Sequence, residues 1–291
     1  MEVMENNYFT IMPMARRMEG LEPGKSYTGS VTVVNPAVAT EELHYKVEVV
    51  PYSVQENGYD ADFATELGRT QLSKWITVEE SKGTLAPNKT AEVNFTVNVP
   101  ENVPAGGQYA AIVVRKDSDA TQDEAQGMMV KSVYEMASLI YAEVAGETVH
   151  AGEVLENEIP IFVTGAPITL RALITNEGNT HEPLAIITKA TDVFTGRVIL
   201  EGDKARTELI MPESKRYLEE EVRDDLPVLG IVHVEQKLYY NGQSYDAVRD
   251  VIICPVWFIG LVVFVIVMLV SLVVHLIRKR VKKRKKKEEK E

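Results

Sequence analysis

The feature that most constrains this chain is an uncharged apolar run near its C-terminal end. No Lys, Arg, Asp or Glu occurs from Val251 to Ile277, and most residues in this run are Val, Leu, Ile or Phe. A helix of that length spans roughly 40 Å, which exceeds the hydrocarbon core of a bilayer at about 30 Å. A buried helix in a soluble protein rarely combines such length with such uniform apolarity. The sequence therefore predicts one transmembrane helix over residues 253–277.

A basic tail follows the predicted span and sets its expected orientation. From Arg278 to the end there are ten Lys and Arg residues and three Glu residues, a net charge of +7. Basic residues directly after a span stay in the cytoplasm, so we expect the tail 278–291 inside and the first 250 residues outside. Interfacial aromatics and headgroup-contacting basic side chains should anchor the span in the bilayer. The predicted anchor residues are Trp257, Phe258, Arg278, Lys279 and Arg280.

This topology requires an export signal, which the first residues do not carry. Residues 1–20 contain no apolar run of signal-peptide length. One expectation is that the true start lies upstream, or that a processed or truncated form is given. The alternative is a tail-anchored protein with a cytosolic domain. It would have to move the +7 tail across the membrane, against the charge rule.

Composition and motifs exclude several classes of function. The whole chain carries −12, so with +7 in the tail the remainder carries −19 and should repel nucleic acid. A single cysteine excludes an internal disulfide, and five widely spaced histidines predict no metal site and no cofactor. The sequence has no nucleophile elbow, P-loop or H-E-x-x-H motif, so we predict that it is not an enzyme. A carboxylate pair that hydrolyses a glycan is the catalytic alternative that stays open.

Alternating apolar and polar residues before Val251 predict an all-β fold. The segments are rich in Val, Ile, Thr and Tyr, are separated by turn signals, and include Asn241-Gly242 as a two-residue hairpin. Seven short strands per hundred-odd residues are typical of immunoglobulin-like sandwiches. The predicted strands are 26–34, 43–51, 75–78, 91–99, 108–115 and 130–143, then 158–162, 168–175, 184–192, 197–200, 216–222, 231–240 and 244–252.

Two tandem sandwich domains are predicted, over residues 5–143 and 144–252. Segments 84–114 and 209–240 share a Pro-led turn, an alternating strand, a second Pro with a nearby Gly, and another strand. Internal duplication explains this similarity, and so do the turn residues between strands that all sandwiches share. The sequence does not decide between these two explanations. Between Lys116 and Met129 lies an acidic segment for which both a solvated loop and a calcium site are open. Its spacing fits no ordered calcium-loop motif.

The first domain carries motifs of a known family. It reads LEPGKSYTGSVTVVNP, LHYKVEVVPYSV, WITVEE, then VNVPENVPAGGQYAAIVV. This order resembles the WxL-interacting proteins of Gram-positive cell surfaces, which have a peptidoglycan-binding domain. The match covers most of Leu21–Val114, followed by the layout of second sandwich, membrane helix and Lys-rich tail. The strongest motif is Gly106-Gly107-Gln108-Tyr109, and the second domain departs from the family pattern and is shorter.

The resemblance implies a membrane-anchored bacterial surface protein with a role in adhesion or as a scaffold. Its first domain would bind peptidoglycan or another wall glycan, and its second domain WxL-type or other surface proteins. The candidate ligand-binding residues are Gly106, Gly107, Gln108 and Tyr109, because glycines allow close approach and a tyrosine can stack on a sugar. The alternative function is a chaperone or assembly factor outside the cytoplasm, which completes a client protein through an exposed edge strand.

Overall fold

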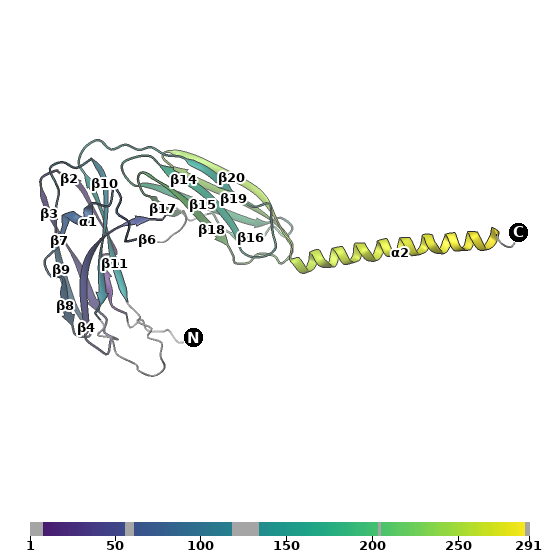
Figure 1. The fold of residues 1–291 in the computed structure, drawn as a ribbon, viewed down its shortest axis with the longest axis horizontal. Coiled ribbons are helices and arrows are strands. Elements are labelled where there is room, and N and C mark those ends of the chain that lie inside the picture. Colours follow the sequence, from purple (N-terminus) through teal and green to yellow (C-terminus); the bar gives the residue numbers. More distant parts are fainter. Residues whose placement is uncertain (1–7, 56–60, 118–133, 203–204, 289–291) are drawn as a thin grey trace. The chain divides into compact units, whose positions relative to one another are not determined.

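The computed structural model describes residues 8–55, 61–117, 134–202 and 205–288, with side chains as far as Lys279 (Figure 1). Within these residues the chain forms two immunoglobulin-like β-sandwiches followed by one long apolar helix. The predicted fold class is therefore confirmed. The acidic segment after Lys116 lies outside the described residues except for Asp117, so calcium binding there stays untested.

The first sandwich consists of two antiparallel sheets with one parallel edge strand. The smaller sheet has the order β1-β3-β9-β7 and the larger one β2-β11-β10-β4-β8, where β2 runs parallel to β11. A two-stranded ribbon, β5-β6, and a single helical turn, α1, lie between β4 and β7 in sequence. The bounds are β1 Thr10–Met12, β2 Ala15–Leu21, β3 Ser26–Asn35, β4 Leu43–Pro51, β5 Ser53–Val54, β6 Ala61–Asp62, α1 Leu72–Trp75, β7 Ile76–Val78, β8 Lys82–Leu85, β9 Lys89–Asn98, β10 Gly106–Lys116 and β11 Glu135–Val144.

Alternating residues of these strands form the first core. From Val31 to the end of β3, and from Val93 to Val97 in β9, every second residue is buried, as the period-two pattern predicts. Gly29 lies opposite Phe95 in the β3–β9 register, and a Cβ on this glycine would lie 2.5 Å from the ring atom Cζ of Phe95. The bare backbone at Gly29 therefore makes room for a fully buried aromatic ring. Trp75 is also buried, at the end of α1.

The second sandwich also has two sheets. One has the order β12-β14-β18 and the other β13-β20-β19-β15-β16, with β17 also paired to β15. The buried aliphatic side chains of β14, β19 and β20 share one hydrophobic core. The bounds are β12 Val154–Glu158, β13 Phe162–Val163, β14 Ile168–Asn176, β15 Glu182–Asp192, β16 Val198–Leu200, β17 Arg206–Ile210, β18 Ser214–Val222, β19 Gly230–Tyr240 and β20 Gln243–Ile253.

Most predicted strands are confirmed to within a few residues, and one is wrong. Asn241 and Gly242 both have positive φ and join β19 to β20 as the predicted two-residue hairpin. Segment 158–162 is not a strand. Glu158 ends β12 in one sheet, residues 159–161 form the connection, and Phe162 begins β13 in the other sheet. Ile159 is buried in the core, whereas Ile161 is exposed, so these alternating apolar residues do not share one face.

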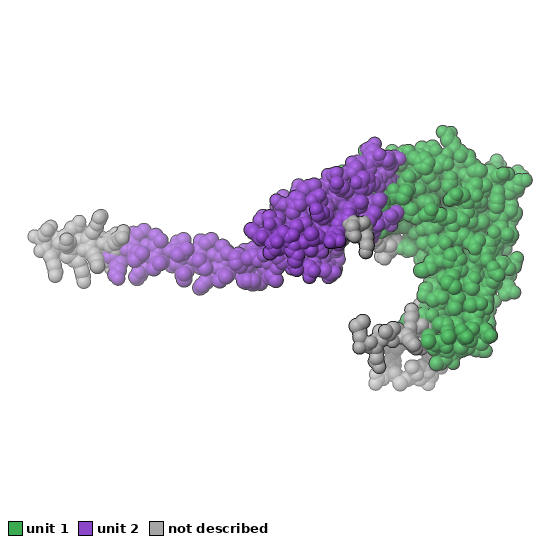
Figure 2. Space-filling model, turned by 180° about the vertical axis from the view of Figure 1, so that it is seen from behind, with its two compact units in different colours: residues 1–155, 173–184, 208–218 green, residues 156–172, 185–207, 219–291 purple. Residues whose placement is uncertain are grey.

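Contacts between residues divide the chain into two compact units (Figure 2). Unit 1 contains residues 1–155, 173–184 and 208–218, and unit 2 contains 156–172, 185–207 and 219–291. Three segments that the predicted boundary at 143/144 assigns to the second domain thus pack with the first: 144–155, 173–184 and 208–218. Whether residues 5–143 and 144–252 fold independently stays a prediction.

The last element is α2, Val256–Glu288. Its stretch Val256–Lys279 has 24 residues, a mean hydropathy of 3.1 and no buried residues, so it is long and apolar enough to cross a membrane. The predicted anchor residues Trp257 and Phe258 lie in its first turn, whereas Arg278, Lys279 and Arg280 lie beyond the apolar run. The helix itself is confirmed, and its insertion in a bilayer is part of the function proposed below.

We predict that Gly29→Ala destabilises the first sandwich by about 1–3 kcal/mol, because its methyl group overpacks the core against Phe95. Combining it with Phe95→Leu should give a smaller loss than the sum of the two single losses, because the leucine relieves the clash. Chemical unfolding of the full chain in detergent measures both effects. Gly68→Ala is the control, since a Cβ there meets nothing within 4 Å. Equal stability of the two alanine variants would contradict this packing.

Candidate functional site

Gly106 and Gly107, the first two predicted ligand-binding residues, lie against the β14–β15 turn in unit 1. Gly106 has a φ of +102°, and a Cβ there would lie 2.3 Å from the carbonyl oxygen of Asn179. The amide of Gly107 donates to the same oxygen at 2.7 Å. The missing side chain of Gly106 therefore serves the close approach of two backbones, whereas a Cβ on Gly107 would lie 2.1 Å from the Tyr109 hydroxyl oxygen. Both are structural uses of small size.

Gln108 and Tyr109 are buried, at 0% and 1% exposure. The Tyr109 hydroxyl lies 3.1 Å from Nδ1 of His181, and its ring meets the Tyr141 ring edge-on with centroids 5.7 Å apart. Burial raises the pKa of Tyr109 far above its usual value, so the phenol is neutral at physiological pH. Gln108 points to the opposite face of β10, and among the described residues its side-chain amide has no hydrogen-bond partner. None of the four predicted residues offers an exposed face, and ligand binding by them stays a prediction.

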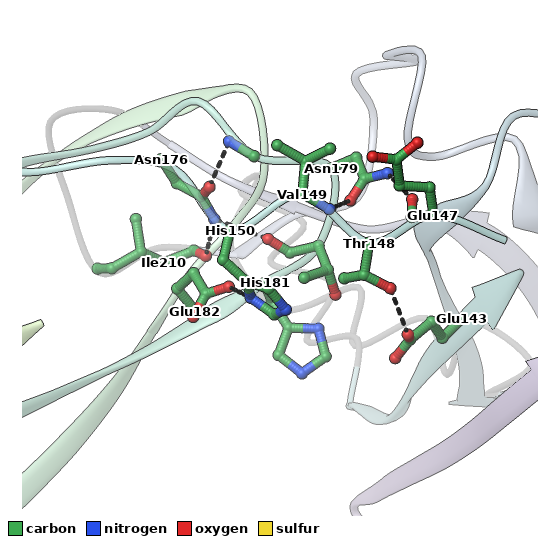
Figure 3. Close-up of polar contacts among 12 residues, drawn as sticks. Glu143, Glu147, Thr148, Val149, His150, Asn176, Asn179, His181, Glu182 and Ile210 are labelled. Carbon is green, nitrogen blue, oxygen red and sulfur yellow. Dashed lines mark hydrogen bonds and ion pairs between the residues drawn. The ribbon is translucent and has the colours of Figure 1, made fainter. Parts of the chain in front are cut away.

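The β14–β15 turn is held by two asparagine side chains (Figure 3). Asn179 accepts from the amide of Val149 at 2.8 Å and donates to the carbonyl of Glu147 at 2.8 Å. Asn176 donates to the carbonyls of Thr180 and Ile210, at 2.8 and 2.9 Å. The turn thereby joins segments that are far apart in sequence. In the sequence both residues read as ordinary turn asparagines, and nothing there indicates which segments they join.

A polar pocket of about 240 Å³ lies beside this turn in unit 1. Nδ1 of His150 forms an ion pair with the largely buried carboxylate of Glu182 on one side (Figure 3). His181 is half-buried on another side, against Tyr109 and Tyr141. A histidine that directly follows a turn is usually an exposed polar side chain, but the His181 ring packs with two tyrosines. The polar residues that line the pocket are Arg17, Glu19, Glu143, Thr148, His150, Thr180, His181 and Glu182.

The side chains that line this pocket hold segments of unit 1 together. Each histidine already has a partner, and among the described residues no group of three or more His, Cys, Asp or Glu side chains could hold a metal ion. Burial lowers the pKa of His181, and the charge of Arg17 adds to this effect. The carboxylates of Glu143 and Glu182 oppose it only in part. His181 is therefore neutral in the folded protein near pH 7.

The second candidate site is the outer edge of β20 in unit 2. Beyond β19, the strand pairs within the described residues only with β13, at Ile252 and Ile253. The amide of Ile252 donates to the carbonyl of Ile161, so the backbone of Ile252 faces outward. Because strand residues alternate, Ser244, Asp246, Val248 and Asp250 also direct their N–H and C=O groups outward. No other described strand takes up these groups.

A groove of about 500 Å³ runs beside this edge. Side chains cross it, since Asn157 donates to the carbonyl of Tyr245 at 3.1 Å and Arg249 to the carbonyl of Ile159 at 3.0 Å. Its size lies within the usual range of binding pockets, about 300–1,000 Å³. Ile161 and Val248 line it and are 62% and 59% exposed. The groove thus combines unpaired backbone groups with exposed apolar side chains.

The lowered pKa of His181 predicts how the stability of unit 1 depends on pH. Below the ordinary histidine pKa of about 6.5, the unfolded chain takes up a proton that the folded chain takes up only at lower pH. The unfolding free energy should therefore fall as the pH drops below about 6.5, by less than about 1.4 kcal/mol per pH unit for this one group. Denaturant unfolding between pH 7.5 and 5.5 measures the slope.

His181→Asn should reduce this slope, and His44→Gln should leave it unchanged. His44 is the matched control because it is exposed and lies on β4 in the same unit. An unchanged slope in His181→Asn would show that other groups carry the pH dependence.

Comparisons with known sequences do not assign the chain to a family. No protein-family model matches it, and no curated protein is similar in sequence. The resemblance to WxL-interacting proteins accordingly stays a prediction.

Solved structures with a similar arrangement include pilus chaperones. A chain of the chaperone–tip adhesion subunit complex CsuC–CsuE of Acinetobacter baumannii is 11% identical, with 84% of this chain and 98% of that chain covered and a TM-score of 0.40. The E. coli chaperone DraB is 14% identical, with coverages of 84% and 96% and a TM-score of 0.39. PapD-like domain 7 of human CEP192 is 12% identical, with coverages of 48% and 87% and a TM-score of 0.30. These likenesses are too distant to carry an argument about function.

Proposed function

We propose that this chain is a non-catalytic, membrane-anchored protein that binds an extended segment of a partner protein along the outer edge of β20. The partner segment adds a strand to the sheet, a recognition mode in which main-chain hydrogen bonds supply affinity. The observation that carries the proposal is the unpaired edge of β20 with a groove beside it. The proposal corresponds to the assembly-factor alternative from the sequence.

The backbone of β20 supports this mode. Four residues from Ser244 to Asp250 present outward N–H and C=O groups at every second position, about 6.8 Å apart in an antiparallel sheet. An extended partner strand has the same repeat. The pairing depends on backbone groups, so it tolerates variation in the partner's sequence.

The side chains beside the edge supply selectivity. Val248 and Ile161 offer apolar contacts, while Arg171 at the groove pairs with Glu219 on the neighbouring strand at 2.9 Å. We infer a partner segment with an apolar side chain directed into the groove. Asp246 and Asp250 place negative charge on β20 itself. Charges on an edge strand oppose pairing between two copies of the same edge.

The C-terminal helix and tail support a surface location. The basic residues after the apolar stretch of α2 favour a cytoplasmic tail, which places both sandwiches outside. The partner is then a protein exposed at, or passing through, the outer face of the membrane. Binding to peptidoglycan stays a prediction from the family resemblance, and the burial of Gly106–Tyr109 lends it no support.

A photo-crosslinking residue in place of Val248 tests partner binding in cells. We expect it to capture a partner protein through a segment of alternating apolar residues. Asp246→Pro should abolish the capture, because proline removes one outward N–H that the fold does not use. The melting temperature should stay nearly unchanged. The control is the same crosslinker at Val198, an exposed position on β16 at the opposite side of the sheet.

Equal capture of the partner from positions 248 and 198 would contradict the strand-addition proposal. So would capture at position 248 that survives Asp246→Pro in a folded protein.

Topology is tested separately, on cells freed of their wall. External protease should remove the residues before Val256 and leave a small membrane-bound fragment that carries the basic tail. An antibody against a tag on the tail should detect the full-length chain shorten to this fragment. Protection of both sandwiches until the cells are lysed would show the opposite orientation.

A further inference from the structure

Three loops of the second sandwich lie at the end where the chain leaves for α2. Gly230, at the start of β19, pairs with Ile253, the last residue of β20. The β18–β19 loop 223–229 therefore lies at this end. Asp192 at the end of β15 pairs with Val232, which brings the β15–β16 loop 193–197 there as well. The parallel pairing of β13 with β20 adds the loop 164–167.

Two of these loops carry exposed apolar tips, which we call the apolar end: Val193, Phe194, Val228 and Leu229. Phe194 is 73% exposed and Val228 is 70% exposed. The two loops lie side by side, because a Cβ on Gly230 would meet Pro227 at 3.2 Å and the Phe194 ring at 4.0 Å. Single exposed apolar residues are common on protein surfaces, but four gathered at one end form a patch.

The β15–β16 turn holds Phe194 in its outward position. The Asp192 carboxylate accepts from the amides of Phe194 and Thr195, at 2.8 and 2.9 Å. The amide of Gly196 donates to the carbonyl of Asp192 at 2.8 Å. Arg197 then ties this turn to the other loop through the carbonyl of Asp225. Hydrogen bonds to the backbone of this turn thus keep the Phe194 ring exposed to solvent.

The chain connection places this end beside the predicted span. Only Cys254 and Pro255 separate β20 from α2 (Figure 1). Consecutive Cα atoms are 3.8 Å apart, so Ile253 lies within about 11 Å of Val256, where the apolar stretch begins. The interfacial layer between hydrocarbon and water is about 5–7 Å thick on each side of a bilayer. Any tip at this end of the sandwich is therefore within reach of that layer when α2 spans the membrane.

We propose that the apolar end is a second membrane contact, which inserts Phe194, Val228 and their neighbours into the headgroup layer and holds the second sandwich against the bilayer. The proposal rests on the membrane anchor of the proposed function. Aromatic and aliphatic side chains at such a depth suit the interface. The hairpin at the opposite end of β20 has a polar tip, Asn241, Gly242 and Gln243, with no apolar side chain.

Fluorescent labels on the full-length chain test this contact in phosphatidylcholine vesicles. Cys254→Ser removes the only native cysteine, and single cysteines at Phe194, Val228, Leu261 and Ser244 then carry an environment-sensitive dye. Leu261 lies within α2 and reports whether the helix is inserted. Ser244 lies at the far end of β20 and serves as the matched control. Brominated lipids quench a dye only where it touches the bilayer.

We expect a blue shift and lipid quenching at positions 194, 228 and 261, and neither at 244. Quenching at 261 with 194 and 228 behaving like 244 would overturn the second contact while leaving the anchor in place. A dye at 194 or 228 that shifts to the blue without being quenched by brominated lipid would show that protein covers this end, which also overturns the proposal. Absence of quenching at 261 would overturn the anchor and the second contact together.

Discussion

The chain at the start of each sandwich adds a strand first to one sheet (β1 or β12) and then to the other (β2 or β13). The place where it changes sheet decides which edges stay open. In the first sandwich the change between β1 and β2 is short. The Ser138 hydroxyl donates to the carbonyl of Pro13 at 2.6 Å, and the amide of Leu139 donates to that of Met14 at 2.9 Å, so pairing with β11 begins at once. In the second sandwich residues 159–161 separate β12 from β13, and β13 itself has only two residues, Phe162 and Val163.

The path of this connection has two consequences for the second sandwich. It reaches β20 only near Ile252 and leaves the backbone of Ser244–Asp250 without a neighbouring strand. It also forms one wall of the groove, where side chains instead of backbone groups span the gap. Unpaired backbone groups on an exposed strand are a surface that another chain can pair with. The candidate binding edge thus follows from how one strand is shared between two sheets.

The same strand joins binding and anchoring. β20 carries the open edge along most of its length and ends two residues before α2. Under the proposed function, a partner segment paired with β20 is held close to the membrane surface. If the apolar end rests on the bilayer, the strand loses the freedom to swing about the short connection at Cys254 and Pro255. The edge then keeps a constant height and direction, which suits a protein that receives an extended segment from another chain.

The sequence by itself determined the features that depend on local periodicity and composition. The strands, the hairpin at Asn241-Gly242 and the helix that begins at Val256 follow from alternation, turn preferences and an uncharged run. What approaches each residue was decided only by the tertiary structure. Gly106 and Gly107 looked like a ligand contact because small residues admit any close neighbour, but the neighbour of Gly106 is the turn at Asn179 and that of Gly107 is the Tyr109 side chain. Likewise, alternation predicts that β20 is a strand but does not reveal which of its edges is paired, because pairing joins residues that are remote in sequence.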